Sequence, residues 1–150
     1  MSADDQRIHS IASIDIMKQE VSRLERLWDC EVNFKTVNPK ARLPAEIADE
    51  VRLIISESVA NAVLHGRARR IEIELLFDRD LKLRIQDDGT GLSNAHGTYD
   101  HKTLARNELG PKSIRRRTER LGGVIRLEST AHGLILDISL PVDTTQTRQP

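Results

Sequence analysis

Two neighbouring stretches of alternation constrain the fold of this chain more than any other feature. Apolar residues stand at every second position at Ile71, Ile73, Leu75, Phe77 and, after Asp78-Arg79-Asp80, at Leu81, Leu83 and Ile85, and the residues between them are charged except at Leu76. This period predicts an antiparallel hairpin with one face on the core and the other in water. Asp87 continues the second run, so we expect its carboxylate on the dry face.

The remaining patterns place helices around this hairpin. In chain order we expect a helix over 8–28, an edge strand over 31–37, a helix from Leu43-Pro44 to about His65, the hairpin, a helix that begins at Gly110-Pro111 and ends at Gly122-Gly123, and a second hairpin of 124–129 and 134–140. This order predicts a sheet rich in antiparallel pairs, with its helices on one face.

One internal segment, from Asn94 to Leu109, is polar and has no period of its own. In a compact domain, an irregular segment of this length is typical of a mobile functional loop. We therefore expect a lid over the site.

Composition limits the class of protein. A chain of 150 residues fits one domain, which we place at 1–142, followed by a polar tail at 143–150. Its 23 basic and 23 acidic residues cancel, and it has few aromatic residues, so we expect no nucleic-acid partner. The single Cys30 excludes an internal disulfide, and no apolar run could span a bilayer, so we expect a cytoplasmic setting without membrane contact by this segment.

The long helix carries a polar file beside its apolar stripe. Glu57, Asn61 and His65 recur at every fourth residue and therefore lie along one edge of the helix. Carboxylate and amide oxygens suit Mg²⁺, which takes few protein ligands and completes its shell with water and phosphate oxygens. The alternative is an ordinary solvated helix edge.

Asp87 makes a binding site more plausible than the polar file alone does. A carboxylate on a dry face needs hydrogen-bond donors, because an unpaired buried charge is costly. The exocyclic amine of a bound base is one source, and the backbone N–H groups of the following glycine turn are the other. Gly89 and Gly91 serve a turn in either case, and they would also allow a ligand to approach the backbone closely.

A third candidate element begins where the lid becomes a helix. The free N–H groups of a helix N-terminus bind anions, and Lys112 adds a positive charge next to Gly110 and Pro111. Other polar residues favour plainer interpretations. We interpret Cys30 as a small buried hydrophobe. A solvated helix face accounts for Arg115, Arg116, Arg117 and Arg120. Loop positions without metal-ligand spacing account for His9, His96, His101 and His132.

Three linked motifs stand in a fixed order along the chain. They are Glu-x-x-x-Asn-x-x-x-His over 57–65, Asp-Asp-Gly-x-Gly over 87–91, and an arginine-rich helix that ends in Leu-Gly-Gly at 121–123. Together they resemble the ATP-binding domain shared by gyrase, heat-shock chaperones, sensor histidine kinases and mismatch-repair ATPases, and most of all sensor histidine kinases of the nitrate-sensor type. The resemblance implies a Bergerat fold, which is an α/β two-layer sandwich: a mixed, mostly antiparallel sheet of about five strands with three main helices on one face.

The resemblance also implies roles for the site residues, with ATP and Mg²⁺ as cofactors. Asn61 would hold the metal, and Glu57 would be the catalytic residue that orients or deprotonates a water or completes the metal shell. Asp87 would bind the adenine amino group. The other expected contacts with the nucleotide come from His65, Gly89, Gly91, Gly110 and Lys112.

By the same resemblance, this is the catalytic domain of a two-component histidine kinase. Its partners would be a His-containing dimerisation domain and a response regulator. The chain lacks the helix that carries the phosphoacceptor histidine, since His9 is followed by Ser10-Ile11. We therefore expect either a fragment of a longer kinase or a free-standing module.

Two alternatives stay open, and departures from the family pattern favour the second of them. In the family's motif at the end of the lid, a glycine and a leucine stand where this chain has Glu108 and Pro111. Leu64 stands where a lysine is common in the family, and Leu134 stands where a threonine is usual. One alternative is an anti-sigma-type serine kinase that binds a transcription-factor partner. The other is a pseudokinase interaction module that binds nucleotide poorly.

Overall fold

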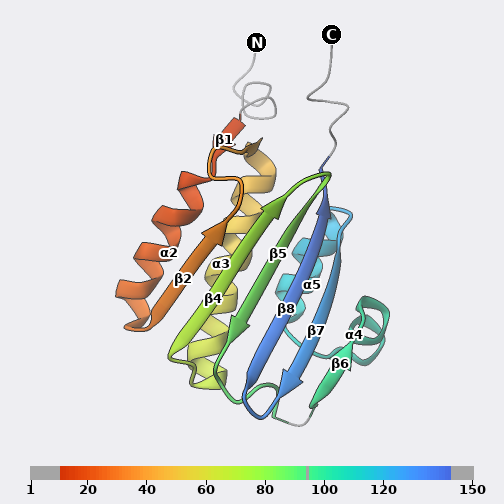
Figure 1. Ribbon diagram of the computed structural model, residues 1–150. Helices are drawn as coiled ribbons and strands as arrows, with labels where there is room; N and C mark the ends of the chain where they lie inside the picture. Colours follow the sequence, from red (N-terminus) through yellow and green to blue (C-terminus); the bar gives the residue numbers. More distant parts are fainter. Residues whose placement is uncertain (1–10, 94, 143–150) are drawn as a thin grey trace.

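The computed structural model describes residues 11–93 and 95–142 (Figure 1). The elements are β1 (Ile11–Ser13), α2 (Asp15–Trp28), β2 (Glu31–Thr36), β3 (Arg42–Pro44), α3 (Ala45–Gly66), β4 (Arg70–Phe77), β5 (Asp80–Asp87), β6 (Gly97–Tyr99), α4 (His101–Asn107), α5 (Lys112–Arg120), β7 (Val124–Thr130) and β8 (Gly133–Pro141). The predicted tail at 143–150, and His9 near the start, lie outside the described residues.

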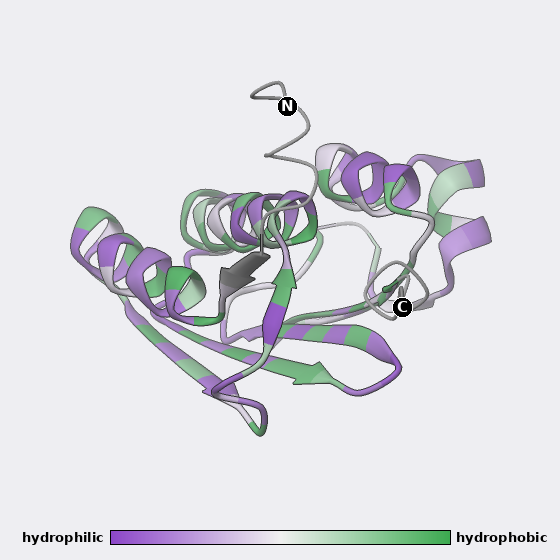
Figure 2. Ribbon diagram, turned by 90° about the horizontal axis from the view of Figure 1, so that it is seen from above, coloured by the Kyte–Doolittle hydropathy of each residue, from purple (hydrophilic) through white to green (hydrophobic). Residues whose placement is uncertain are grey.

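One six-stranded sheet forms a layer of the molecule, in the order β2-β4-β5-β8-β7-β6. Among the strands of the described residues, only β2 and β4 pair in parallel, and β1 pairs with β3 in a separate two-stranded sheet. Seen from above, α2, α3 and α5 lie on one side of the large sheet (Figure 2). The predicted two-layer fold with a mixed sheet is confirmed, although the sheet has six strands rather than about five, and α4 is an additional helix.

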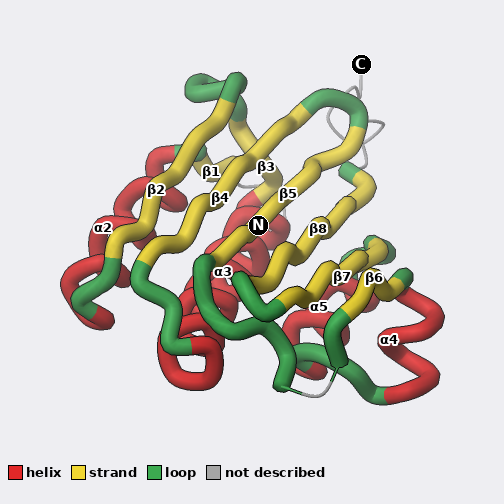
Figure 3. Tube along the Cα trace, turned by 60° about the horizontal axis from the view of Figure 1, so that its bottom comes forward, coloured by secondary structure: helices red, strands yellow, loops and turns green. Residues whose placement is uncertain are grey.

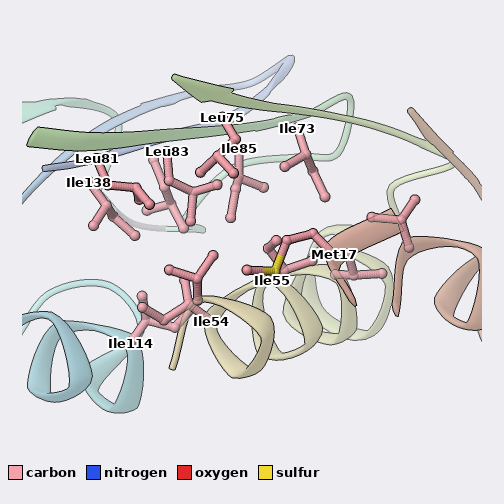
Figure 4. Packing of buried hydrophobic residues seen from close by; sticks show 14 of the residues in the cluster. Met17, Ile54, Ile55, Ile73, Leu75, Leu81, Leu83, Ile85, Ile114 and Ile138 are labelled. Carbon is pink, nitrogen blue, oxygen red and sulfur yellow. The ribbon is translucent and has the colours of Figure 1, made fainter. Parts of the chain in front are cut away.

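The core lies between the sheet and the helices, and the predicted hairpin supplies much of it. β4 and β5 pair with Ile73 opposite Ile85 and Leu75 opposite Leu83, and all four side chains are buried. They face Ile54 of α3 and side chains from the other helices (Figure 4). The period of two thus places the alternating apolar residues of this hairpin on the helix side of the sheet, whereas Leu76, which breaks the alternation, is exposed on the other side.

The expected lid is only partly irregular, so that prediction was wrong in its detail. β6 pairs with β7, and α4 follows with the Asp100 side chain accepting a hydrogen bond from the backbone N–H of Thr103, at 2.9 Å. His101, expected in a loop, lies in α4, where its Nδ1 accepts a hydrogen bond from the backbone N–H of Ile125 at 3.0 Å. The histidine ring thus continues the pairing of the β7 edge beyond the last residue of β6.

Both proline-marked helices begin one residue later than expected. Pro44 belongs to β3, and Pro111 has an extended backbone, with φ −74° and ψ 105°, so that α5 begins at Lys112. Near the N-terminus, the predicted helix over 8–28 was wrong over residues 11–14, because β1 precedes α2, which starts at Asp15; residues 8–10 lie outside the described residues. Helical periodicity does not show where a short flanking strand takes over.

Candidate functional site

A cavity of about 300 Å³ opens where the C-terminal part of α3 meets the end of β5 and the start of β8. Figure 3 brings this end of the molecule forward, together with the loops that connect β5, β6 and α5. The helix α3 contributes Ser58, Asn61, Ala62, His65 and Gly66, the sheet contributes Ile85, Asp87, Leu134 and Leu136, and Gly91, Leu92, Gly110, Pro111 and Ile114 complete the wall. A mostly apolar wall with a few polar groups is typical of a small-molecule site.

Asp87 is the acidic group of this cavity. Its Oδ1 accepts hydrogen bonds from the backbone N–H groups of Gly89, at 2.8 Å, and Leu134, at 3.3 Å. Within 11–93 and 95–142, no residue donates to Oδ2. Burial raises the pKa of Asp87, an effect that the two backbone hydrogen bonds oppose and the neighbouring charge of Asp88 reinforces. The carboxylate thus keeps one acceptor oxygen uncommitted beside an apolar cavity.

The three residues of the polar file on α3 do not all face the cavity. Asn61 and His65 line the cavity, as expected, whereas Glu57 does not. Glu57 turns instead to α5, where the Ser113 hydroxyl donates to its Oε1 at 2.9 Å. Its second oxygen, Oε2, is buried and has no hydrogen-bond partner in the described part of the chain. The carboxylate and the amide remain one helical turn apart on the same helix.

The two glycines after Asp87 are required by the protein's own chain. A Cβ at Gly89 would lie 2.5 Å from the carbonyl oxygen of Gly66, and one at Gly91 would lie 2.2 Å from that of Thr130. Gly91 also has φ +70°, which favours glycine. Gly91 lines the cavity and Gly89 does not. The close approach that we expected for a ligand is thus made, at both positions, to neighbouring backbone.

On the lid side, Gly110 lines the cavity with φ +75°, followed by Pro111. Lys112 is exposed and does not line it. Glu108, the residue in place of a glycine, has a left-handed backbone with φ 51°, and its N–H closes the end of α4 on the carbonyl of Leu104. Glu108 thus adopts the left-handed backbone conformation that glycine favours.

The arginines of α5 are not one uniform solvated face. Arg117 donates to Glu50 of α3 at 3.0 Å, and Arg115 lies 3.5 Å from Glu119. Both arginines are half-buried. Arg116 and Arg120 are exposed and fit the expected interpretation.

Sequence reasoning did not identify three residues of the site. Ser58 is buried against the cavity, and its hydroxyl has no hydrogen-bond partner among the residues described. It stands four residues before Ala62 on the apolar stripe, which is a signal that could have identified it. Leu134 acts through its backbone N–H and Ser113 pairs with a residue 56 positions away, so neither left a local signal.

The described residues contain no cluster of three or more His, Cys, Asp or Glu side chains that could hold a metal ion. A metal at this site would therefore take few protein ligands, as Mg²⁺ bound to phosphates does. In the same residues, no helix is long and apolar enough to cross a membrane.

Known proteins resemble this chain in both sequence and fold. Residues 46–144 match the family model described as histidine kinase-, DNA gyrase B-, and HSP90-like ATPase. An uncharacterized sensor-like histidine kinase of Chloroflexus aurantiacus is 32% identical over 108 residues, which cover 70% of this chain and 18% of that protein. The anti-sigma F factor of Clostridium acetobutylicum is 28% identical over 68 residues, which cover 43% of this chain and 48% of that protein.

Among solved structures, the ATP-binding domain of PrrB from Mycobacterium tuberculosis has the same fold, with a TM-score of 0.68 and 25% identity. The match covers 90% of this chain and 98% of that domain. By contrast, the chain spans less than half the length of either sequence relative.

Proposed function

Because the chain belongs to the family of histidine kinase-, DNA gyrase B- and HSP90-like ATPases, we propose that it is the catalytic ATP-binding domain of a two-component histidine kinase. Residues 1–142 form this domain, which presents the γ-phosphate of ATP to a histidine on a separate dimerisation domain. A response regulator then takes up the phosphoryl group. Such transfer depends mainly on alignment and charge neutralisation, so a domain that holds the nucleotide supplies most of what is needed.

The observation that carries the proposal is the hydrogen bonding of the two carboxylate oxygens of Asp87. Backbone N–H groups hold its Oδ1 in place, while no described residue donates to Oδ2. Ile85, Leu136 and Ala62 supply apolar walls beside it. An adenine ring fits both features, since its faces are apolar and its amino group would donate to Oδ2.

Magnesium belongs to the same proposal. The amide oxygen of Asn61 is a suitable ligand, and the unpartnered Oε2 of Glu57 is a hard oxygen acceptor one turn away. When bound, the ion neutralises phosphate charge. Asn61 would bind it, and Glu57 would orient a water molecule or complete its shell. His65, Gly110 and Lys112 would contact the rest of the nucleotide.

The test is calorimetric titration of ATP into the wild type and two neighbouring variants. Asp87→Asn keeps an oxygen for the backbone N–H groups but exchanges the acceptor Oδ2 for a donor, so we expect at least a tenfold loss of affinity, on the order of one lost hydrogen bond to a charged group. Asp88→Asn removes the adjacent carboxylate, whose Oδ1 accepts from the N–H groups of Arg69 and Arg70. That control should bind ATP as the wild type does. Equal affinity in the wild type and Asp87→Asn would refute the adenine assignment.

A second function is favoured by the match to the anti-sigma F factor. A serine kinase of that type would bind a transcription-factor partner directly. Gel filtration of the chain with candidate sigma and anti-sigma-antagonist proteins separates the two proposals, because a histidine kinase domain forms no stable complex with them. A protein that binds no ATP at all would instead favour the pseudokinase alternative.

A further inference from the structure

The contact between α3 and α5 has a polar bridge at each end and an apolar centre. At one end Arg117 donates to Glu50, and at the end near the cavity Ser113 donates to Glu57. Between the two bridges, Ile54 and Ile114 are fully buried and come from the two facing helices (Figure 4). Because residue numbers rise along α3 as they fall along α5, the helices run antiparallel. The site end is therefore held by a neutral hydroxyl, and the far end by an ion pair.

The bond from Ser113 divides the roles of the two oxygens of Glu57. Oε1 is occupied at 2.9 Å, while Oε2 is buried and unpartnered in the described part of the chain. A buried carboxylate oxygen without a donor is unfavourable, so a ligand that supplies a donor or a cation gains from it. Asn61, which lines the cavity, lies one turn further along the helix.

We propose that Ser113 is a positioning residue for the metal: its hydroxyl fixes Oε1 of Glu57 and thereby reserves Oε2 for Mg²⁺ or a water bound to it. Ser113 lies in the first turn of α5, three residues after Gly110. The position of this turn is thus linked to the metal site. The inference rests on the proposed function and adds to it a residue that does not line the cavity.

The test compares ATP affinity with and without Mg²⁺, by calorimetry, in single and double variants. In Ser113→Ala we expect the strengthening of ATP binding by Mg²⁺ to fall about tenfold, which is typical for loss of a group that orients a metal-binding carboxylate. Affinity without Mg²⁺ should stay within about twofold. Ser113→Thr keeps a hydroxyl and should keep the effect of Mg²⁺. In a Glu57→Gln background, Ser113→Ala should cause no further loss, because both act through one group.

Glu50→Gln is the matched control, since it weakens the bridge at the far end of the same helix contact. It should lower the melting temperature without changing the effect of Mg²⁺. The inference is overturned if Ser113→Ala retains the full effect of Mg²⁺, or if Glu50→Gln loses as much as Ser113→Ala does. A wild type that binds no ATP would overturn the proposed function and this inference with it, whereas a wild type that responds to Mg²⁺ as Ser113→Ala does would overturn the inference alone.

Discussion

Gly66 and Gly89 face each other across the junction of α3 with the turn after β5, and they should respond in opposite ways to the same substitution. A Cβ on Gly89 would lie 2.5 Å from the carbonyl oxygen of Gly66 and 3.0 Å from its carbonyl carbon. A Cβ on Gly66 would find only ordinary contacts, at 3.7 Å, with Gly89 and Thr90. The space on the two sides of this contact is therefore unequal.

The expected cost of Gly89→Ala follows from what must move. Both atoms in conflict belong to the backbone, so no side chain can rotate away, and forced separation of packed elements costs about 1–3 kcal/mol. Separation also weakens the hydrogen bond from the N–H of Thr90 to the carbonyl of Gly66, which is 3.0 Å long and contributes about 1 kcal/mol. The free energy of unfolding should fall by about 2–4 kcal/mol. In Gly66→Ala it should rise by at most about 0.5–1 kcal/mol, which is the gain inside a helix, because Gly66 is the last residue of α3.

Thermal and urea unfolding of both variants measure this difference. For a chain of this size, 1 kcal/mol shifts the melting temperature by about 2–4 °C, so Gly89→Ala should melt about 4–16 °C below the wild type. Gly66→Ala should melt at or above it. The reasoning is refuted if Gly89→Ala melts with the wild type, or if Gly66→Ala is destabilised to the same extent.

Two further predictions concern charge at the site. Burial raises the pKa of Asp87, so the native state is penalised increasingly as pH rises from the unfolded value of about 4 through the raised native value. Asp87→Asn should therefore melt above the wild type at pH 7, and thermal scans should show this gap closing below about pH 4; a gap that widens on acidification would contradict the sign. At position 108, glycine removes both the charge and the steric cost of the left-handed backbone, whereas glutamine removes only the charge. The free energy of unfolding in urea should therefore be about 1 kcal/mol higher for Glu108→Gly than for Glu108→Gln. Calorimetry should show that both variants bind ATP more tightly relative to ADP, and an unchanged ratio would mean that this charge does not limit binding.

How much of this fold the sequence predicts depends on the length over which a period repeats. The hairpin of β4 and β5 has eight residues in each strand, enough for the alternation to show both the strands and the face on which Asp87 lies. The 22 residues of α3 likewise show a helix and its polar edge. Over these lengths the local pattern and the tertiary packing agree.

β6 and α4 show where such reasoning fails. They have three and seven residues, which is too short for either period to repeat. Their positions depend instead on distant partners, since β6 pairs with β7 and His101 accepts a hydrogen bond from Ile125. A sequence pattern records neither partner, and polar composition then suggests an irregular loop.

The two carboxylates of the site show the same limit at the level of single atoms. For Asp87 the sequence left two interpretations, a ligand contact or a bond to the glycine turn, and the structure makes them compatible because Oδ1 serves the turn while no described residue donates to Oδ2. Glu57 is divided similarly, with Oε1 bound to Ser113 and Oε2 left without a partner in the described chain. Sequence spacing identifies such residues, but it does not show which oxygen is hydrogen-bonded within the protein and which is left for a ligand. The donors to Oδ1 and Oε1 include Leu134 and Ser113, which lie 47 and 56 residues away. A site of this kind is therefore specific only once β8 and α5 have packed, so that variants which loosen either element should weaken ATP or Mg²⁺ binding without altering any residue that touches them.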